Sequence, residues 1–223
     1  MKAFLTAGGD CDIDFLKKSY NENDYDYVIG IDGGSKYLWD AGIRADLIIG
    51  DFDTLSENAL TEYEKSGIKV KRFPAEKDET DTELAILEAI LANCDEIHLY
   101  AAIGTRIDHL FGNIMSLQHA YKKNIKAYII DKNNRIHIAF KEEKLKKDEQ
   151  YGKYVSFIPM TASVSGITLE GFMYSLKDAV LTNDKSLAIS NQIADNVAKI
   201  SYKEGILLMI ESKDWLEILN IMW

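Results

Sequence analysis

The sequence predicts a mixed protein, with an N-terminal α/β domain built on a mostly parallel sheet and a C-terminal all-β domain. Two observations support this prediction. Apolar runs alternate with helical patterns up to about residue 130, and only short strand-like runs follow from about residue 132. We therefore expect one domain over residues 1–132 and a second over residues 133–223.

The alternation in the N-terminal part is regular. Strand-like runs occur at 2–7, 25–31, 45–49, 68–73, 96–102 and 125–130, and helical patterns lie between them at 12–20, 37–39, 56–66, 83–92 and 108–122. The helix at 83–92 has Leu84, Leu87 and Leu91 at helical spacing, which predicts that these leucines form its apolar face. Ligands of such sheets bind beyond the carboxyl ends of the strands, so this edge is the expected site.

The C-terminal part has a different pattern. Short strands are expected at 136–140, 154–158, 186–189, 198–202 and 206–210, with turn signals between them. The charged run at 141–148 is expected to be a solvated hairpin tip.

Composition excludes several classes of function. The formal charge of −10 argues against a nucleic-acid binder, and no window approaches the length of an apolar membrane span. The N-terminal apolar run is too short for a secretory signal. Only Cys11 and Cys94 occur, which indicates neither a disulfide framework nor a zinc site and favours the cytoplasm.

The segment 47–53 organises the prediction of the site. An apolar strand ends there at Gly50, and Asp51 and Asp53 follow two residues apart. Side chains at this spacing share a face of an extended chain, so the two carboxylates repel each other unless a cation lies between them. The alternative is an ordinary aspartate-rich turn.

Further polar residues follow the other predicted strands. Hard divalent cations such as Mg²⁺ take oxygen ligands and bridge carboxylates to phosphates, and glycines let phosphates approach the backbone. Arg106 provides positive charge for a phosphate oxygen. The carboxylates expected at this magnesium and phosphate site are Asp32, Asp51, Asp53, Asp78 and Asp81, and the glycines are Gly8, Gly9, Gly33 and Gly34.

Several of these residues also have a structural explanation. Thr80 and Glu83 form a capping-box pattern, and Asp81 suits the first turn of a helix as well as a metal site. Asp108 can cap its helix, and His109 can be an ordinary helix residue.

Four motifs together resemble the thiamin pyrophosphokinase family. They are Asp32-Gly33-Gly34, Gly50-Asp51-Phe52-Asp53-Thr54, Lys77-Asp78-Glu79-Thr80-Asp81-Thr82-Glu83 and Gly104-Thr105-Arg106-Ile107-Asp108-His109, in the family's order and with matching spacing. The resemblance covers most of residues 1–130 and is thinner beyond. There Ser190-Asn191 is similar to a pair that the family uses near thiamin. Thr54 replaces the usual serine, and Ile193 stands where an aromatic residue is expected.

The resemblance implies a Rossmann-like ATP-binding catalytic domain, a thiamin-binding β-sandwich and a homodimer. It implies transfer of pyrophosphate from ATP to the thiamin hydroxyl with Mg²⁺, releasing AMP. The residues it implies are Asp51, Asp53, Asp81 and Arg106 for catalysis; Asp32, Asp51, Asp53 and Asp81 for the metal; Asp32, Gly33, Gly34, Asp78, Thr80, Arg106 and Asp108 for the nucleotide; and Ser190 and Asn191 for thiamin. Gly8 and Gly9 are expected at the nucleotide as well, because they follow the first predicted strand.

Two alternative functions remain open from the sequence. One is a pyrophosphokinase of the same architecture that acts on another hydroxymethyl heterocycle, such as a pterin. The other is a nucleotide- or metal-binding module without catalysis. The alcohol that causes AMP release tests the first alternative. ATP binding without AMP release for any alcohol would indicate the second.

Overall fold

The computed structural model describes residues 1–52, 57–74 and 76–214 of the 223-residue chain. The chain divides into two compact units between Lys132 and Asn133. Among the helices of the described residues, none is both long and apolar enough to cross a membrane.

The first unit is built on a parallel sheet, as the alternating pattern predicts. Its strands follow one another in space as β4-β3-β2-β1-β5-β6, and each neighbouring pair is parallel. Their side chains are mostly buried because helices cover the sheet. The strands are β1 (Lys2–Thr6), β2 (Tyr27–Ile31), β3 (Leu47–Gly50), β4 (Lys69–Arg72), β5 (Glu96–Tyr100) and β6 (Lys126–Ile130).

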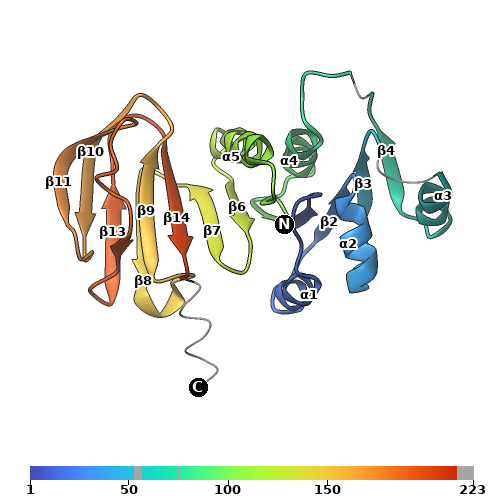
Figure 1. Ribbon diagram of the computed structural model, residues 1–223, viewed down its shortest axis with the longest axis horizontal. Helices are drawn as coiled ribbons and strands as arrows, with labels where there is room; N and C mark the ends of the chain where they lie inside the picture. Colours follow the sequence, from blue (N-terminus) through green and yellow to red (C-terminus); the bar gives the residue numbers. More distant parts are fainter. Residues whose placement is uncertain (53–56, 75, 215–223) are drawn as a thin grey trace. The chain divides into compact units, whose positions relative to one another are not determined.

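Five helices connect these strands. α4 and α5 pack side by side, while α1 and α2 cover the opposite face of the sheet (Figure 1). The chain builds the sheet outward from β1 to β4 and then returns to place β5 on the other side of β1. The carboxyl ends of β1 and β5 therefore form the topological switch point, where open α/β sheets bind ligands. The helices are α1 (Ile13–Asn21), α2 (Gly34–Ala41), α3 (Glu57–Lys65), α4 (Asp81–Leu91) and α5 (Ile107–Tyr121).

Helix α4 forms where the sequence predicts it, but the leucines of its expected apolar face are not its buried residues. Its buried residues are Thr82, Ala85, Ile86 and Ala89, whereas Leu91 is 75% exposed. This face carries Ile86 together with small side chains, and through it α4 packs against both the sheet and α5.

The second unit is an antiparallel β-sandwich, as predicted. Its strands form two groups with the orders β7-β14-β9-β12 and β11-β10-β13-β8. Buried apolar residues from both groups, including Phe157, Ile167, Leu169 and Met209, form one core between them. The strands are β7 (Asn134–Ile138), β8 (Glu142–Lys146), β9 (Tyr154–Pro159), β10 (Ser163–Glu170), β11 (Leu176–Thr182), β12 (Asn191–Gln192), β13 (Val197–Ser201) and β14 (Leu207–Ser212).

The structure differs from the prediction for this unit at residues 141–148, at 186–189 and in the region of β10 and β11. The charged run at 141–148 is not a hairpin tip, because Glu142–Lys146 forms β8 and pairs with β13. The run at 186–189 is a turn region, and Ser190, which has a φ of 58°, separates it from the short strand β12. Strands β10 and β11 were not predicted, since Gly166 and charged residues interrupt their apolar patterns.

Candidate active site

The loops after β1 and β5 are joined at the switch point by backbone hydrogen bonds. Gly9 N donates to Ala101 O at 2.7 Å, and Asp10 N donates to Ile103 O at 2.8 Å. A Cβ atom on Gly9 would lie 2.6 Å from Ala101 O, so this approach requires glycine. Gly8 and Gly9 therefore lie at the edge where the sequence predicts them.

Asp32 and the turn Gly33-Gly34 connect β2 to α2 at the same edge. A Cβ atom on Gly34 would lie 2.5 Å from Ala7 O, which shows how closely α2 begins against the end of β1. Asp32 N donates to Ile49 O at 2.8 Å, which ties this turn to β3. The Asp-Gly-Gly motif thus joins the ends of three neighbouring strands.

Asp51 lies in the next turn. A Cβ atom on Gly50 would lie 3.1 Å from Asp32 Cβ, so Asp51 directly follows a point where the β2 and β3 turns are in contact. The predicted proximity of the Asp32 and Asp51 segments is therefore present. Asp53, the second carboxylate of this motif, lies outside the described residues, as does Thr54.

Three non-glycine residues with positive φ lie along this edge. Asp32, Phe52 and Ala101 follow β2, β3 and β5, and they have φ values of 43°, 61° and 51°. A bulky residue such as Phe52 rarely adopts a positive φ, and each such residue costs about 1–3 kcal/mol. The Phe52 side chain is buried, which holds the turn in this conformation. Strained residues of this kind cluster at functional sites.

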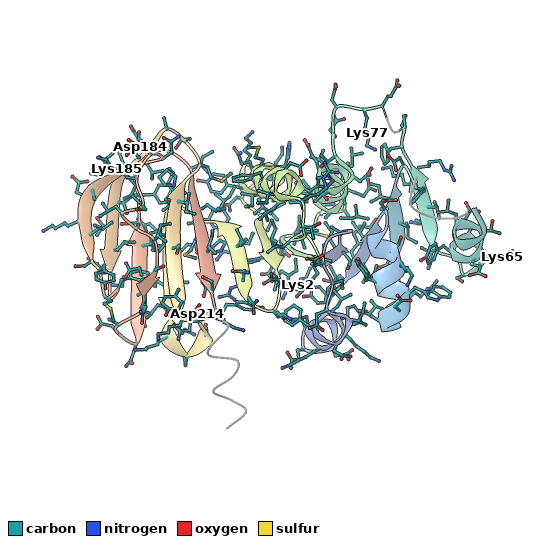
Figure 2. The ribbon with its side chains drawn as sticks, in the orientation of Figure 1. Lys2, Lys65, Lys77, Asp184, Lys185 and Asp214 are labelled. Carbon is teal, nitrogen blue, oxygen red and sulfur yellow. The ribbon has the colours of Figure 1, made fainter. Side chains whose placement is uncertain are left out.

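The loop that follows the carboxyl end of β4 contains Lys77, Asp78 and Thr80, and Asp81 begins α4 directly after it. Figure 2 shows Lys77 in this loop. Thr80 Oγ1 accepts a hydrogen bond from Glu83 N at 3.2 Å, which confirms the predicted N-cap. The Glu83 carboxylate lies 2.8 Å from His119 Nε2. Asp81 Oδ1 lies 2.7 Å from Lys77 Nζ, a contact that the sequence analysis did not predict, although spacing of four residues between opposite charges was visible.

Arg106 and Asp108 form a bidentate pair at the start of α5. Arg106 Nε and Nη2 donate to the two Asp108 oxygens at 3.2 and 2.6 Å, and His109 N donates to Asp108 Oδ1 at 3.0 Å. The Arg106 hydrogen bonds lower the pKa of Asp108 to about 2, and Asp108 raises the pKa of Arg106. Both side chains are 66% exposed, and exposed pairs contribute little stability, so Arg106 can exchange this partner for an anionic ligand.

A cavity of about 490 Å³ lies beside the switch point, within the first unit. Its lining includes Asp10, Cys11, Phe15, Tyr100 and Asp131. Burial, together with the charge of a neighbouring aspartate, raises the pKa of Cys11 to about 11, so this thiol is protonated at neutral pH. The sequence analysis identified the strand ends but not this cavity.

In the second unit, Ser190 directly precedes β12 and Asn191 begins it, and the two residues have different surroundings. Asn191 is 2% exposed; its Nδ2 donates to Tyr174 O at 2.7 Å, and its Oδ1 accepts from Tyr174 N and Gln192 N at 3.0 and 2.9 Å. Ser190 is exposed, and its N donates to Ser156 Oγ at 3.0 Å. Asn191 therefore positions Tyr174, an exposed aromatic residue that the sequence analysis missed.

Carboxylates alone do not complete a metal site in the part of the chain that the structure describes. No three Asp, Glu, His or Cys side chains there are grouped closely enough to hold a metal ion. Since Asp53 lies outside these residues, the complete set of predicted ligands is not described.

The comparisons with known proteins give one consistent family. Residues 19–129 match the model of the thiamin pyrophosphokinase catalytic domain, and residues 142–207 match that of the vitamin B1 binding domain. A thiamine pyrophosphokinase of Bacillus subtilis is 38% identical over 187 residues, which cover 83% of this chain and 87% of the relative.

Solved structures agree with the sequence comparisons. The thiamine pyrophosphokinase structure from Bacillus subtilis has a TM-score of 0.84 and 34% identity, covering 96% of this chain and 100% of that chain. The thiamin pyrophosphokinase structure from Geobacillus thermodenitrificans has a TM-score of 0.82 and 31% identity, and the match covers 96% of this chain and 99% of that chain. The chain therefore belongs to the thiamin pyrophosphokinase family.

Proposed function

We propose that this chain transfers pyrophosphate from ATP to the hydroxyl of thiamin, giving thiamin diphosphate and AMP, and that Mg²⁺ takes part. This is the thiamine diphosphokinase reaction of its family. The observation that carries the proposal is the convergence of glycine turns and aspartates at one edge of the parallel sheet. Asp32 and Phe52 in these turns have positive φ values, a kind of backbone strain that is often found at functional sites.

The donors at this edge suit Mg²⁺. The candidate ligands are the carboxylates of Asp32, Asp51, Asp53 and Asp81, and hard oxygen ligands are those that Mg²⁺ prefers. Asp81 Oδ1 is buried and accepts no hydrogen bond within the described residues; only an ion pair meets its charge there. When bound, Mg²⁺ would neutralise charge on the polyphosphate and orient it.

Residues of the chain would bind the rest of the nucleotide. Gly8, Gly9, Gly33 and Gly34 are the proposed phosphate contacts through their backbone atoms, because glycine puts no side chain between the backbone and a phosphate oxygen. Arg106 would leave Asp108 and pair with phosphate oxygens as their negative charge increases. Asp78, Thr80 and Asp108 are the remaining nucleotide contacts that we propose. In-line attack by the thiamin hydroxyl on the β-phosphorus then needs positioning and charge neutralisation more than a strong base.

The second unit is proposed to bind thiamin around Ser190. Asn191 holds the backbone of Tyr174, whose side chain is exposed, and we assign to this ring the stacking role for which Ile193 is unsuited. Ile193 is buried and bridges to Phe172. In this assignment Ser190 contacts thiamin and Asn191 acts mainly by positioning its neighbours.

A homodimer is part of the proposal. On α5, Ile107, Phe111 and Met115 follow one another at intervals of four residues and are 65%, 58% and 59% exposed. An exposed apolar stripe of this kind typically marks an interface.

We place the reaction in the cytoplasm. The two free thiols, Cys11 and Cys94, support this location, because a reducing compartment keeps thiols free.

The test is incubation of the full chain with ATP, thiamin and Mg²⁺, followed by measurement of AMP and thiamin diphosphate. We expect one AMP for each thiamin diphosphate formed and loss of both products with EDTA. AMP release with a hydroxymethyl pterin but not with thiamin would refute the substrate. ATP binding without AMP release for either alcohol would refute catalysis.

A further inference from the structure

Lys77 lies in the loop between β4 and α4, and it contacts Asp81, which is one of the proposed metal ligands. Its Nζ atom lies 2.7 Å from Asp81 Oδ1, and the two side chains are only 13% and 22% exposed. The same ammonium donates to Pro74 O at 3.2 Å and lies 5.9 Å from the centre of the Phe73 ring. A carbonyl oxygen and an aromatic face thus surround it in addition to Asp81.

The contact is not a product of regular helix geometry. Lys77 precedes α4, which begins at Asp81, so the loop must fold back to bring the two charges together. By contrast, the Lys36–Asp40 pair has the same spacing but lies within α2, where residues four apart are neighbours in any helix. Lys36 and Asp40 are also far more exposed, at 66% and 40%.

Burying the charged Oδ1 atom of Asp81 without a cation beside it costs free energy. The other proposed ligands add negative charge at the same edge of the sheet, which increases this cost. Lys77 supplies one positive charge there. A lysine ammonium is a compact charge on a flexible stem, so it can leave one oxygen and reach another without movement of the backbone. Such a side chain suits a site whose charge changes when a ligand binds.

We propose that Lys77 is a tethered counter-ion: it neutralises Asp81 while the site is free of metal, and it moves to the phosphate oxygens when Mg²⁺ and ATP bind. Lys77 and the metal then compete for Asp81 in the nucleotide-free protein, whereas Lys77 and the metal act together once the polyphosphate is present. The proposal rests on the function proposed above. It adds a positioning residue that discourages metal binding without nucleotide.

The decisive experiment measures binding of Mn²⁺ to the nucleotide-free chain by electron paramagnetic resonance. Lys77→Met is nearly isosteric and removes the competing charge, so we expect Mn²⁺ to bind at least roughly tenfold more tightly than to the wild type. Lys77→Arg keeps the charge and should stay within about threefold of the wild type. Lys36→Met, which removes the matched pair on α2, should not change the Mn²⁺ affinity.

A second measurement examines the nucleotide-bound state. Binding of ATP in saturating Mg²⁺ should weaken roughly tenfold in Lys77→Met and recover in Lys77→Arg. Circular dichroism establishes that each variant is folded, and Lys77→Gln replaces Lys77→Met if the latter fails to fold. Combining Lys77→Met with Asp81→Asn should abolish the gain in Mn²⁺ affinity, because the oxygen for which Lys77 competes has then lost its charge.

Unchanged or weaker Mn²⁺ binding in Lys77→Met would overturn the proposal and leave Lys77 as a structural partner of Asp81. The assay of AMP and thiamin diphosphate tests the proposed function separately. A wild-type chain that forms no AMP while Lys77→Met binds Mn²⁺ more tightly would refute the function but support the role of Lys77. Product formation by the wild type together with unchanged Mn²⁺ binding in Lys77→Met would support the function and refute the role of Lys77.

Discussion

Replacement of Asn191 by alanine tests whether this residue organises the proposed thiamin site. The Asn191 side chain makes three hydrogen bonds to backbone atoms of Tyr174 and Gln192, at 2.7, 3.0 and 2.9 Å, and it is almost completely buried. At about 1 kcal/mol of net stability for each bond, Asn191→Ala should lower the free energy of unfolding by roughly 3 kcal/mol. Partial access of water to the freed backbone groups makes this an upper value.

The functional effect follows from the loss of position. Without Asn191, the backbone at Tyr174 is no longer held beside Ser190, so the KM for thiamin should rise roughly tenfold, equal to about 1.4 kcal/mol. The KM for ATP should not change, because the nucleotide contacts lie in the first unit. This split distinguishes a local effect from general loss of folded protein.

Urea denaturation followed by circular dichroism gives the stability, and AMP release at varied thiamin gives the KM. Since the chain has two compact units, their transitions are followed with separate probes before a single free energy is assigned. Asn196→Ala, at an exposed position of the same unit, is the matched control and should change neither quantity. A stability loss below about 0.5 kcal/mol together with an unchanged KM for thiamin would refute the reasoning.

Three further predictions follow from the structure. Asp51→Asn and Asp53→Asn should each lower the rate of AMP release by at least about 100-fold with unchanged circular dichroism, and full Mg²⁺-dependent activity in either variant would contradict the metal assignment. The hydrogen bond from His98 lowers the pKa of Glu96 from 4.5 to about 2, so Glu96 contributes stability above pH 4.5 that is lost as the pH falls toward 2. Acid titration of unfolding should show this loss in the wild type and not in Glu96→Gln; identical curves would contradict the pKa shift. Phe111→Glu should convert the proposed dimer to a monomer in light scattering, and an unchanged mass would exclude the α5 stripe as the interface.

The α/β unit could be predicted closely because its strands are buried runs separated by helices. Apolar residues at every position of β3, for example, leave few alternatives once turn residues mark both ends. The face of α4 could not be predicted in this way. Hydrophobicity favoured its leucines, but the packing of α4 against the sheet and α5 buries Ala85, Ile86 and Ala89 instead.

The sandwich was harder to predict because its strands pair with distant parts of the chain. β8 is charged along much of its length and is extended because β13 provides backbone partners. β10 contains a register shift at Gly166, which breaks the alternation that normally indicates a strand. Nonlocal hydrogen bonds therefore override local pattern in this unit.

By itself, the sequence determined the α/β and all-β architecture, the family resemblance and the edge of the sheet at which aspartates, glycines and Arg106 gather. These features depend on the order of residues along the chain and on the regular geometry of parallel strands. Tertiary structure decided that Lys77 contacts Asp81, that Phe52 is strained, and that the buried Asn191 bonds to the backbone of Tyr174. Such contacts depend on how loops fold back on neighbouring elements, and neither propensity nor spacing specifies that path.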